Sequence, residues 1–156
     1  MIEPVVDASV SVTWFVREEL SAEAELLLAS DAAFHAPDLL VPEFANAIWK
    51  KVRLGTVPAE DASALVRALI RSPLRFHPVT PLVERALAIA AETSRTVYDS
   101  VYVALAESLQ ITLVTADDRL ANALLGTRWS NLVVSLRTWA AATVPTDQPM
   151  TGPSVE

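Results

Sequence analysis

The chain has 156 residues and a mass of 16.9 kDa, which fits one domain with a core large enough to fold without disulfide bonds or a structural metal. It contains no cysteine and only two histidines, so disulfide frameworks, zinc–thiolate clusters and cysteine nucleophiles are excluded, and carboxylates are the main reactive groups left. The formal charge of −7 argues against a broadly basic surface for holding nucleic acid.

The mean hydropathy of +0.34 is high, but charged residues interrupt every apolar stretch before it reaches the roughly 20 residues that a membrane span needs. The N-terminal sequence MIEPVVDAS has no basic segment ahead of an apolar one, so a secretory signal is not expected. We therefore expect a cytoplasmic protein that does not associate with membranes. The apolar surplus is expected to cover an interface with another chain.

Short apolar or β-branched runs alternate with segments of helical periodicity. The predicted strands lie at residues 3–6, 33–36, 74–79, 111–115 and 132–135. The predicted helices start at Ser21 and at the stretch YDSVYVALAE, and cover residues 40–54, 58–71, 80–94 and 118–125. This alternation predicts a single α/β domain, residues 1–144, with a mostly parallel central sheet of about five strands and helices on both faces. Residues 145–156 are rich in proline and polar residues, and are predicted to be a flexible tail.

Four acids from distant segments are predicted to lie at one edge of this sheet. Asp7 directly follows the first strand, and Asp117 follows the strand ITLVT by one residue after Thr115. Glu43 and Asp99 lie in the first turns of their helices. In open α/β folds the functional crevice lies beyond the carboxyl ends of the strands. The spacing therefore predicts that the four carboxylates share one crevice.

Each acid also has a purely structural explanation. Asp7 is typical of a turn residue, Glu43 and Asp99 gain about 0.3–1 kcal/mol from a helix dipole, and Asp117 or Asp118 can cap the following helix. The predicted convergence favours a site, because two carboxylates about 4 Å apart repel by roughly 4 kcal/mol at an effective dielectric constant near 20. Such a cluster requires protons or cations.

Carboxylate oxygens without a nearby cysteine or histidine select Mg²⁺ or Mn²⁺ over zinc or copper. An ion held this way orients and deprotonates a water molecule, and it stabilises the charge that builds on a phosphodiester during displacement. The four acids account for −4 of the net charge, so the rest of the chain carries −3 and its basic residues, almost all arginine, can border the site. The acidic net charge therefore does not exclude a nuclease.

The four acids also stand in recognisable stretches, which occur in a fixed order: VVDASV, APDLLVPEFANAIWK, YDSVYVALAE and LVTADDRL. Each stretch is short and degenerate, but the ordered set at typical distances is fairly specific. In these stretches the chain resembles the PIN-domain ribonucleases, and most closely the VapC-type toxins of bacterial toxin–antitoxin pairs. The resemblance extends over nearly the whole chain, to about Trp139.

The resemblance implies a divalent-metal-dependent endoribonuclease that uses Mg²⁺ or Mn²⁺. Its catalytic, metal-coordinating acids would be Asp7, Glu43, Asp99 and Asp117. Relatives of this kind cleave RNA, are silenced by a cognate antitoxin whose segment covers the acidic crevice, and often form dimers. We therefore expect an RNA substrate, a cognate antitoxin and a homodimer.

Supporting residues are implied by the same resemblance. The hydroxyls of Ser9 and Thr115 would lie beside the metal, and Asn46, one helical turn after Glu43, would support the site. Asp118 matches a position that is often basic or polar, so we interpret it as a helix cap or as an extra ligand acting through water.

Two other classes of function are weighed against the nuclease. Aspartyl-phosphate enzymes also place an aspartate after the first strand, but phosphatases of that type show Asp-x-Asp, and the motif Asp7-Ala8-Ser9 lacks the second acid. A receiver domain needs an aspartate after its third strand and a lysine after its fifth, where this chain has Thr80 and Ser135-Leu136-Arg137. The third reading is a catalytically silent PIN-like module whose acids bind basic segments of a partner.

Overall fold

The computed structural model describes residues 3–143, which form a five-stranded, all-parallel sheet with the strand order β3-β2-β1-β4-β5. The strands are β1 (Val5–Val6), β2 (Phe34–Pro37), β3 (Leu74–His77), β4 (Leu113–Thr115) and β5 (Val133–Ser135). The predicted α/β class and parallel sheet are confirmed. The predicted flexible tail, residues 145–156, lies outside the described residues.

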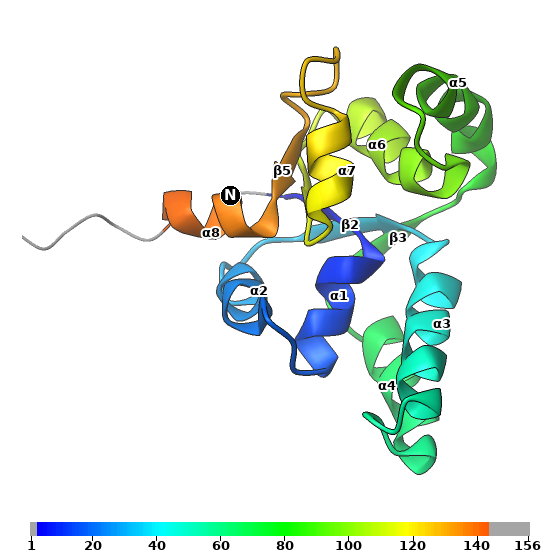
Figure 1. Cartoon of the computed structure of the whole chain (residues 1–156), viewed down its shortest axis with the longest axis vertical. Helices are drawn as coiled ribbons and strands as arrows, with labels where there is room; N and C mark the ends of the chain where they lie inside the picture. Colours follow the sequence, from blue (N-terminus) through cyan, green and yellow to red (C-terminus); the bar gives the residue numbers. More distant parts are fainter. Residues whose placement is uncertain (1–2, 144–156) are drawn as a thin grey trace, which may run out of the picture.

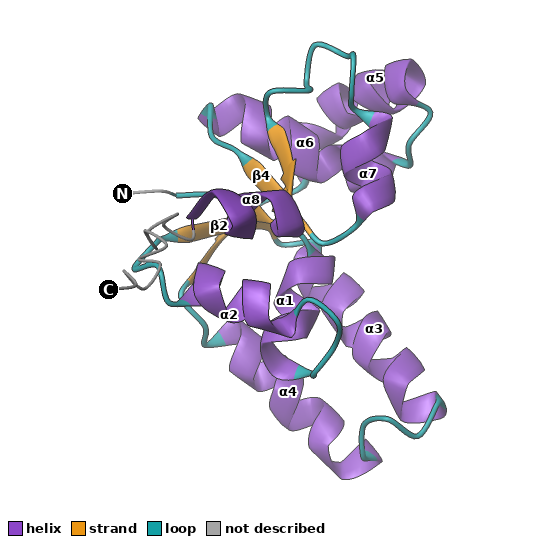
Figure 2. Ribbon diagram, turned by 60° about the vertical axis from the view of Figure 1, so that its left-hand side comes forward, coloured by secondary structure: helices purple, strands orange, loops and turns teal. Residues whose placement is uncertain are grey.

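Within the described range, helices cover both faces of the sheet, with α1 to α4 on one side and α5, α6 and α7 on the other (Figures 1 and 2). The helices are α1 (Ala8–Phe15), α2 (Ser21–Leu28), α3 (Leu40–Arg53), α4 (Ala62–Ile70), α5 (Val83–Thr93), α6 (Val97–Leu109), α7 (Asp118–Ala123) and α8 (Leu136–Thr143). Short 3-10 turns at Ala59–Asp61 and Thr80–Leu82 lead into α4 and α5. Among the described residues, no helix has the length and apolarity that crossing a membrane requires.

Strand β1 lies at the centre of the sheet, between β2 and β4. Its two residues, Val5 and Val6, are completely buried, as expected for a central parallel strand covered on both faces. Val6 pairs with Val114 in β4, so the residues that follow them, Asp7 and Thr115, are neighbours at the carboxyl end of the sheet. Strand β1, although only two residues long, therefore sets the position of Asp7.

Two helices have no counterpart in the sequence prediction, α1 and α8. The α1 sequence, ASVSVTWF, is rich in β-branched residues, which disfavour helices when isolated. Tertiary packing and the cap supplied by Asp7 outweigh this preference. α8 starts directly after β5, and its Leu136, Trp139 and Ala140 are buried.

Helix α6 carries Asp99 and is buried on all sides from Ser100 to Ala106. It packs against α5 on one side and contacts β1, β2 and β4 on the other. A helix that is surrounded in this way does not show a single apolar stripe. The consequence for the site is a rigid support beneath the first turn of α6.

Candidate functional site

Asp7 occupies the carboxyl end of the central strand and is 6% exposed. Its Oδ1 accepts hydrogen bonds from the Ser9 hydroxyl and from the Val10 amide, the latter at 3.2 Å, and its Oδ2 accepts one from the Thr115 hydroxyl. The Val10 bond makes Asp7 the N-cap of α1. The structure thus places the predicted supporting residues Ser9 and Thr115 in direct contact with the first acid.

Burial raises the pKa of Asp7 to about 6, although the hydrogen bonds from Ser9, Thr115 and Val10 partly offset this, and the nearby charge of Asp117 raises the pKa further. Burial is thus the main electrostatic cost at Asp7, and a divalent cation bound to this carboxylate would offset that cost.

Asp117 follows β4 and lies close enough to Asp7 for their charges to interact. Its Oδ1 accepts a hydrogen bond of 3.0 Å from the amide of Arg119, so Asp117 is the N-cap of α7. The amide of Asp117 donates to the Thr115 hydroxyl at 3.0 Å, which ties the two acids to one hydrogen-bonded network. Asp118 is exposed in the first turn of α7, so its interpretation as the cap is wrong.

Glu43 lies in the first turn of α3, the helix that follows β2. Its Oε1 accepts a hydrogen bond of 2.6 Å from the phenol of Tyr102, which projects from α6. Burial is the main cause of the raised pKa of Glu43, which the Tyr102 bond lowers and the charge of Asp99 raises. Asn46 is exposed one turn later on α3, and within residues 3–143 it forms no side-chain hydrogen bond to an acid.

Asp99 lies in the first turn of α6 but does not cap it. The cap is Thr96, whose hydroxyl accepts a hydrogen bond of 3.0 Å from the Asp99 amide. The Asp99 carboxylate instead accepts a hydrogen bond of 2.9 Å from Nη2 of Arg95. Nε of Arg95 is buried and has no hydrogen-bond partner in the described part of the chain. The capping interpretation of Asp99 is therefore wrong.

Two of the acids follow β1 and β4 and two lie in the first turns of α3 and α6, and their charges interact in two pairs, Asp7 with Asp117 and Glu43 with Asp99. Within residues 3–143 no three acids or histidines are close enough to hold one ion as they stand. Each carboxylate accepts a hydrogen bond from its own neighbour. The four acids offer an ion only carboxylate oxygens, which are the ligand atoms that Mg²⁺ and Mn²⁺ prefer.

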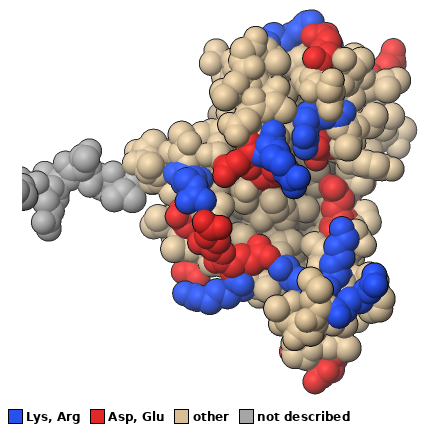
Figure 3. Space-filling model, in the orientation of Figure 1, with Lys and Arg blue, Asp and Glu red and all other residues tan. Residues whose placement is uncertain are grey.

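A hollow lies between α7 and the helices α1 and α3, and both acidic and basic side chains border it (Figure 3). A groove of about 600 Å³ begins beside the site at Ser9 and Ala116. It continues past Val12 and Leu20 to the exposed side chain of Leu54. The four acids themselves do not line the groove, which reaches the site through Ser9, the hydrogen-bond donor to Asp7.

Tyr102 and Arg95 are neighbours of the acids that the sequence patterns did not single out. In the sequence, Tyr102 fits the pattern of apolar positions expected of a buried helix. The available signal is its spacing, because a residue three positions after Asp99 lies on the same helix face. Arg95 precedes the helix by two residues and shows no pattern at all.

The PIN domain family model matches residues 5–123. Ribonuclease VapC3 of Pyrobaculum aerophilum is 37% identical over 119 residues, which cover 75% of this chain and 91% of that protein. Ribonuclease VapC9 of Mycobacterium tuberculosis is 34% identical over 118 residues, covering 76% of this chain and 88% of VapC9.

Two crystal structures share the fold. A Pyrobaculum aerophilum protein superposes with a TM-score of 0.66 at 28% identity, covering 90% of this chain and 88% of its own. VapC20 of Mycobacterium tuberculosis, a toxin that cleaves the sarcin–ricin loop, superposes with a TM-score of 0.61 at 17% identity, covering 78% and 95%. At that identity the second likeness concerns the fold alone. From the family match and the curated relatives, the chain belongs to the PIN-domain family and, within it, to the VapC ribonucleases.

Proposed function

We propose that the chain hydrolyses RNA phosphodiester bonds internally with the help of Mg²⁺ or Mn²⁺, and that it acts as the toxin of a type II toxin–antitoxin pair. The ligands are Asp7, Glu43, Asp99 and Asp117. The observation that carries the proposal is the position of Asp7 and Asp117 at the carboxyl ends of two adjacent parallel strands. Glu43 and Asp99 begin the helices that face this edge.

A bound divalent ion would lower the pKa of a coordinated water and stabilise the negative charge that develops on the phosphate. The chain's own residues organise the ligands. Ser9 and Thr115 hold both oxygens of Asp7, and the α7 backbone holds Asp117. Arg95 and Arg119 lie beside Asp99 and Asp117, where their charges attract the phosphate backbone of RNA.

The test is cleavage of a broad pool of transcripts by purified, antitoxin-free protein. We expect cleavage with Mg²⁺ or Mn²⁺, and a loss of at least about 100-fold in EDTA, because charge stabilisation by the metal is worth several kcal/mol. Protein that is folded and binds the ion but cuts no RNA contradicts the proposal. That result would leave the catalytically silent binding module as the function.

The groove that starts at Ser9 and Ala116 is the proposed binding site for a segment of the cognate antitoxin. A segment lying on its apolar lining would reach the acids and block access to RNA. Lys50, Lys51, Glu18 and Glu19 line the same groove and offer charges of both signs to a partner. Leu54, at 81% exposed, is the most exposed apolar side chain of that lining.

Leu54→Arg is expected to weaken antitoxin binding by more than about tenfold and to leave RNA cleavage unchanged, because a charge replaces an apolar anchor away from the acids. Binding is measured by titration of the toxin with its antitoxin, and cleavage in the assay above. Leu125→Arg is the matched control, since Leu125 is 68% exposed and lies outside the groove. Equal binding by the two variants would refute this binding site.

A homodimer and a cytoplasmic location complete the proposal. Trp49, Ile70 and Leu87 are large apolar side chains that are more than half exposed, and such surface is commonly covered by another chain.

A further inference from the structure

We infer that Tyr102 is a positioning residue of the site, whose phenol hydroxyl fixes the carboxylate of Glu43 in the orientation that receives the metal ion. The inference rests on the proposed function for its biological meaning. The dependence of metal binding on the Tyr102 hydroxyl is measured separately from RNA cleavage.

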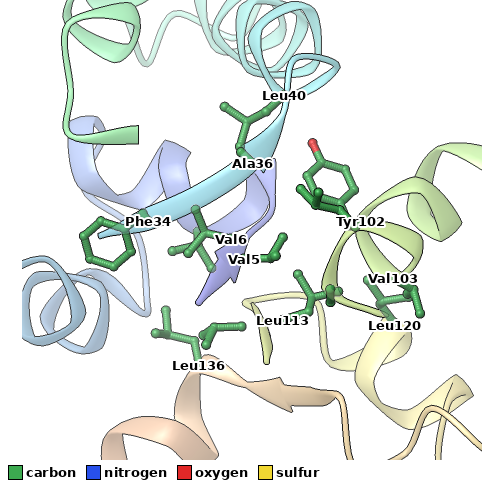
Figure 4. Packing of buried hydrophobic residues seen from close by; sticks show 14 of the residues in the cluster. Val5, Val6, Phe34, Ala36, Leu40, Tyr102, Val103, Leu113, Leu120 and Leu136 are labelled. Atoms are coloured by element: carbon green, nitrogen blue, oxygen red, sulfur yellow. The ribbon is translucent and has the colours of Figure 1, made fainter. Parts of the chain in front are cut away.

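The contact joins two elements that are remote in the sequence. Tyr102 projects from α6 and is 2% exposed, and its hydroxyl donates a hydrogen bond of 2.6 Å to Oε1 of Glu43 in the first turn of α3. Figure 4 shows the phenol oxygen pointing away from α6 toward the start of α3, where Leu40 lies. The bond therefore spans the space between helices from opposite faces of the sheet.

The same face of α6 carries Asp99 and the hydrogen-bond donor to Glu43, Tyr102. Tyr102 stands three residues after Asp99, and residues at this spacing are neighbours on a helix surface. Asp99 acts as a ligand directly, whereas Tyr102 acts through Glu43. The buried stretch Ser100–Ala106 holds both groups in fixed relation to the sheet.

The hydroxyl is difficult to explain by packing. A phenylalanine ring would fill the same buried space, and a buried hydroxyl costs free energy unless it is hydrogen-bonded. Within the described residues, the side-chain partner of this hydroxyl is Glu43, and the backbone amide of Ala8 also lies within hydrogen-bonding reach of the phenol. The bond to Glu43 is thus the side-chain interaction that a phenylalanine at this position would lose.

The bond has a direct consequence for metal binding. A glutamate side chain has three rotatable torsions, and Glu43 is only half-buried, so without a donor it is free to turn toward solvent. With the phenol on Oε1, the orientation is fixed and Oε2 remains available to an ion. Loss of such supporting hydrogen bonds typically costs about 10–100-fold in metal affinity or activity.

The experiment is a double-mutant cycle with the full chain. Its readout is the affinity for Mn²⁺, measured from the electron paramagnetic resonance signal of the free ion. Tyr102→Phe is expected to lower the affinity about tenfold and the cleavage rate by a similar factor at limiting Mn²⁺. In the Glu43→Gln background the same change is expected to have less than about a twofold effect, since the acid through which it acts is gone. Glu43→Asp, whose shorter side chain moves the carboxylate away from the phenol, is the second background if binding to Glu43→Gln is too weak to measure.

The matched control is Tyr98→Phe, which removes a phenol hydroxyl from the same helix at a side chain that is 63% exposed. It is expected to bind Mn²⁺ and cleave RNA as the wild type does. Thermal unfolding without metal is expected to give the wild-type midpoint for Tyr98→Phe and a midpoint lower by no more than a few degrees for Tyr102→Phe, which loses one buried hydrogen bond but keeps the ring.

The outcomes that overturn the inference are specific. If Tyr102→Phe binds Mn²⁺ with wild-type affinity, Tyr102 has no positioning role. If Tyr102→Phe lowers the affinity equally in the wild-type chain and in Glu43→Gln, the hydroxyl does not act through Glu43. Wild-type protein that binds no Mn²⁺ overturns it together with the metal site. Protein that binds Mn²⁺ but cuts no RNA refutes the proposed function alone, and the cycle still decides the role of Tyr102.

Discussion

Asp99→Asn is expected to reduce RNA cleavage by at least about 100-fold and to leave the fold intact. The loss follows from the removal of a proposed metal ligand, because charge stabilisation by the ion would be worth several kcal/mol. Stability is expected to change by less than about 1 kcal/mol, because the Arg95–Asp99 ion pair is about a quarter exposed and pairs near the surface contribute little. Cleavage assays and chemical unfolding measure the two effects.

Thr96→Ala is the complementary variant. It removes the hydroxyl that caps α6, so it is expected to cost about 1 kcal/mol of unfolding free energy and to retain cleavage. Glu84→Gln is the matched control for charge, because Glu84 is an exposed acid in the first turn of α5 and is not a proposed ligand. An Asp99→Asn variant as active as Glu84→Gln would exclude Asp99 from the site.

Asp7→Asn is expected to make the metal-free protein more stable at neutral pH, by about 1–3 kcal/mol, and to abolish cleavage. Burial raises the pKa of Asp7 from 3.8 to about 6, and each unit corresponds to about 1.4 kcal/mol. The folded state therefore holds the proton more tightly than the unfolded state. The penalty for ionising Asp7 is absent below about pH 4, grows as the pH rises toward 6, and stays constant above it.

Asparagine cannot ionise, so the stability gained over wild type should follow the same pH course. Urea unfolding in EDTA between pH 4 and 8 measures this difference. Added Mg²⁺ is expected to reverse the order of stability, since an ion that binds only the folded wild type stabilises it in proportion to its concentration. If Asp7→Asn is less stable at pH 8 in EDTA, the hydrogen bonds from Ser9 and Thr115 outweigh the cost of burial.

The sequence predicted the α/β class, the parallel sheet, the approximate positions of all five strands and the family. These features depend on local properties, namely the alternation of apolar runs with helical periodicity and four short motifs in order. The proposed ligand set also comes from this level, because strand ends and helix starts can be located from neighbouring residues. Its metal-binding role stays a prediction.

The errors lie where a local preference competes with tertiary contacts. The β-branched residues of α1 become helical because packing and the Asp7 cap outweigh their intrinsic preference. The cap of α6 is Thr96 and not Asp99, since a hydroxyl three residues earlier takes the amide that Asp99 exposes. Sequence spacing alone does not rank such alternatives.

What only the tertiary structure decided is which donor faces each acid. Residues as far apart as Thr115 and Asp7, or Tyr102 and Glu43, meet because of the strand register and the packing of α6 between α5 and the sheet. No local pattern encodes these pairs, because each arises from contacts between elements that are distant along the chain. The sequence by itself determined which acids are available at the edge of the sheet, and the fold determined how each of them is held and how deeply it is buried.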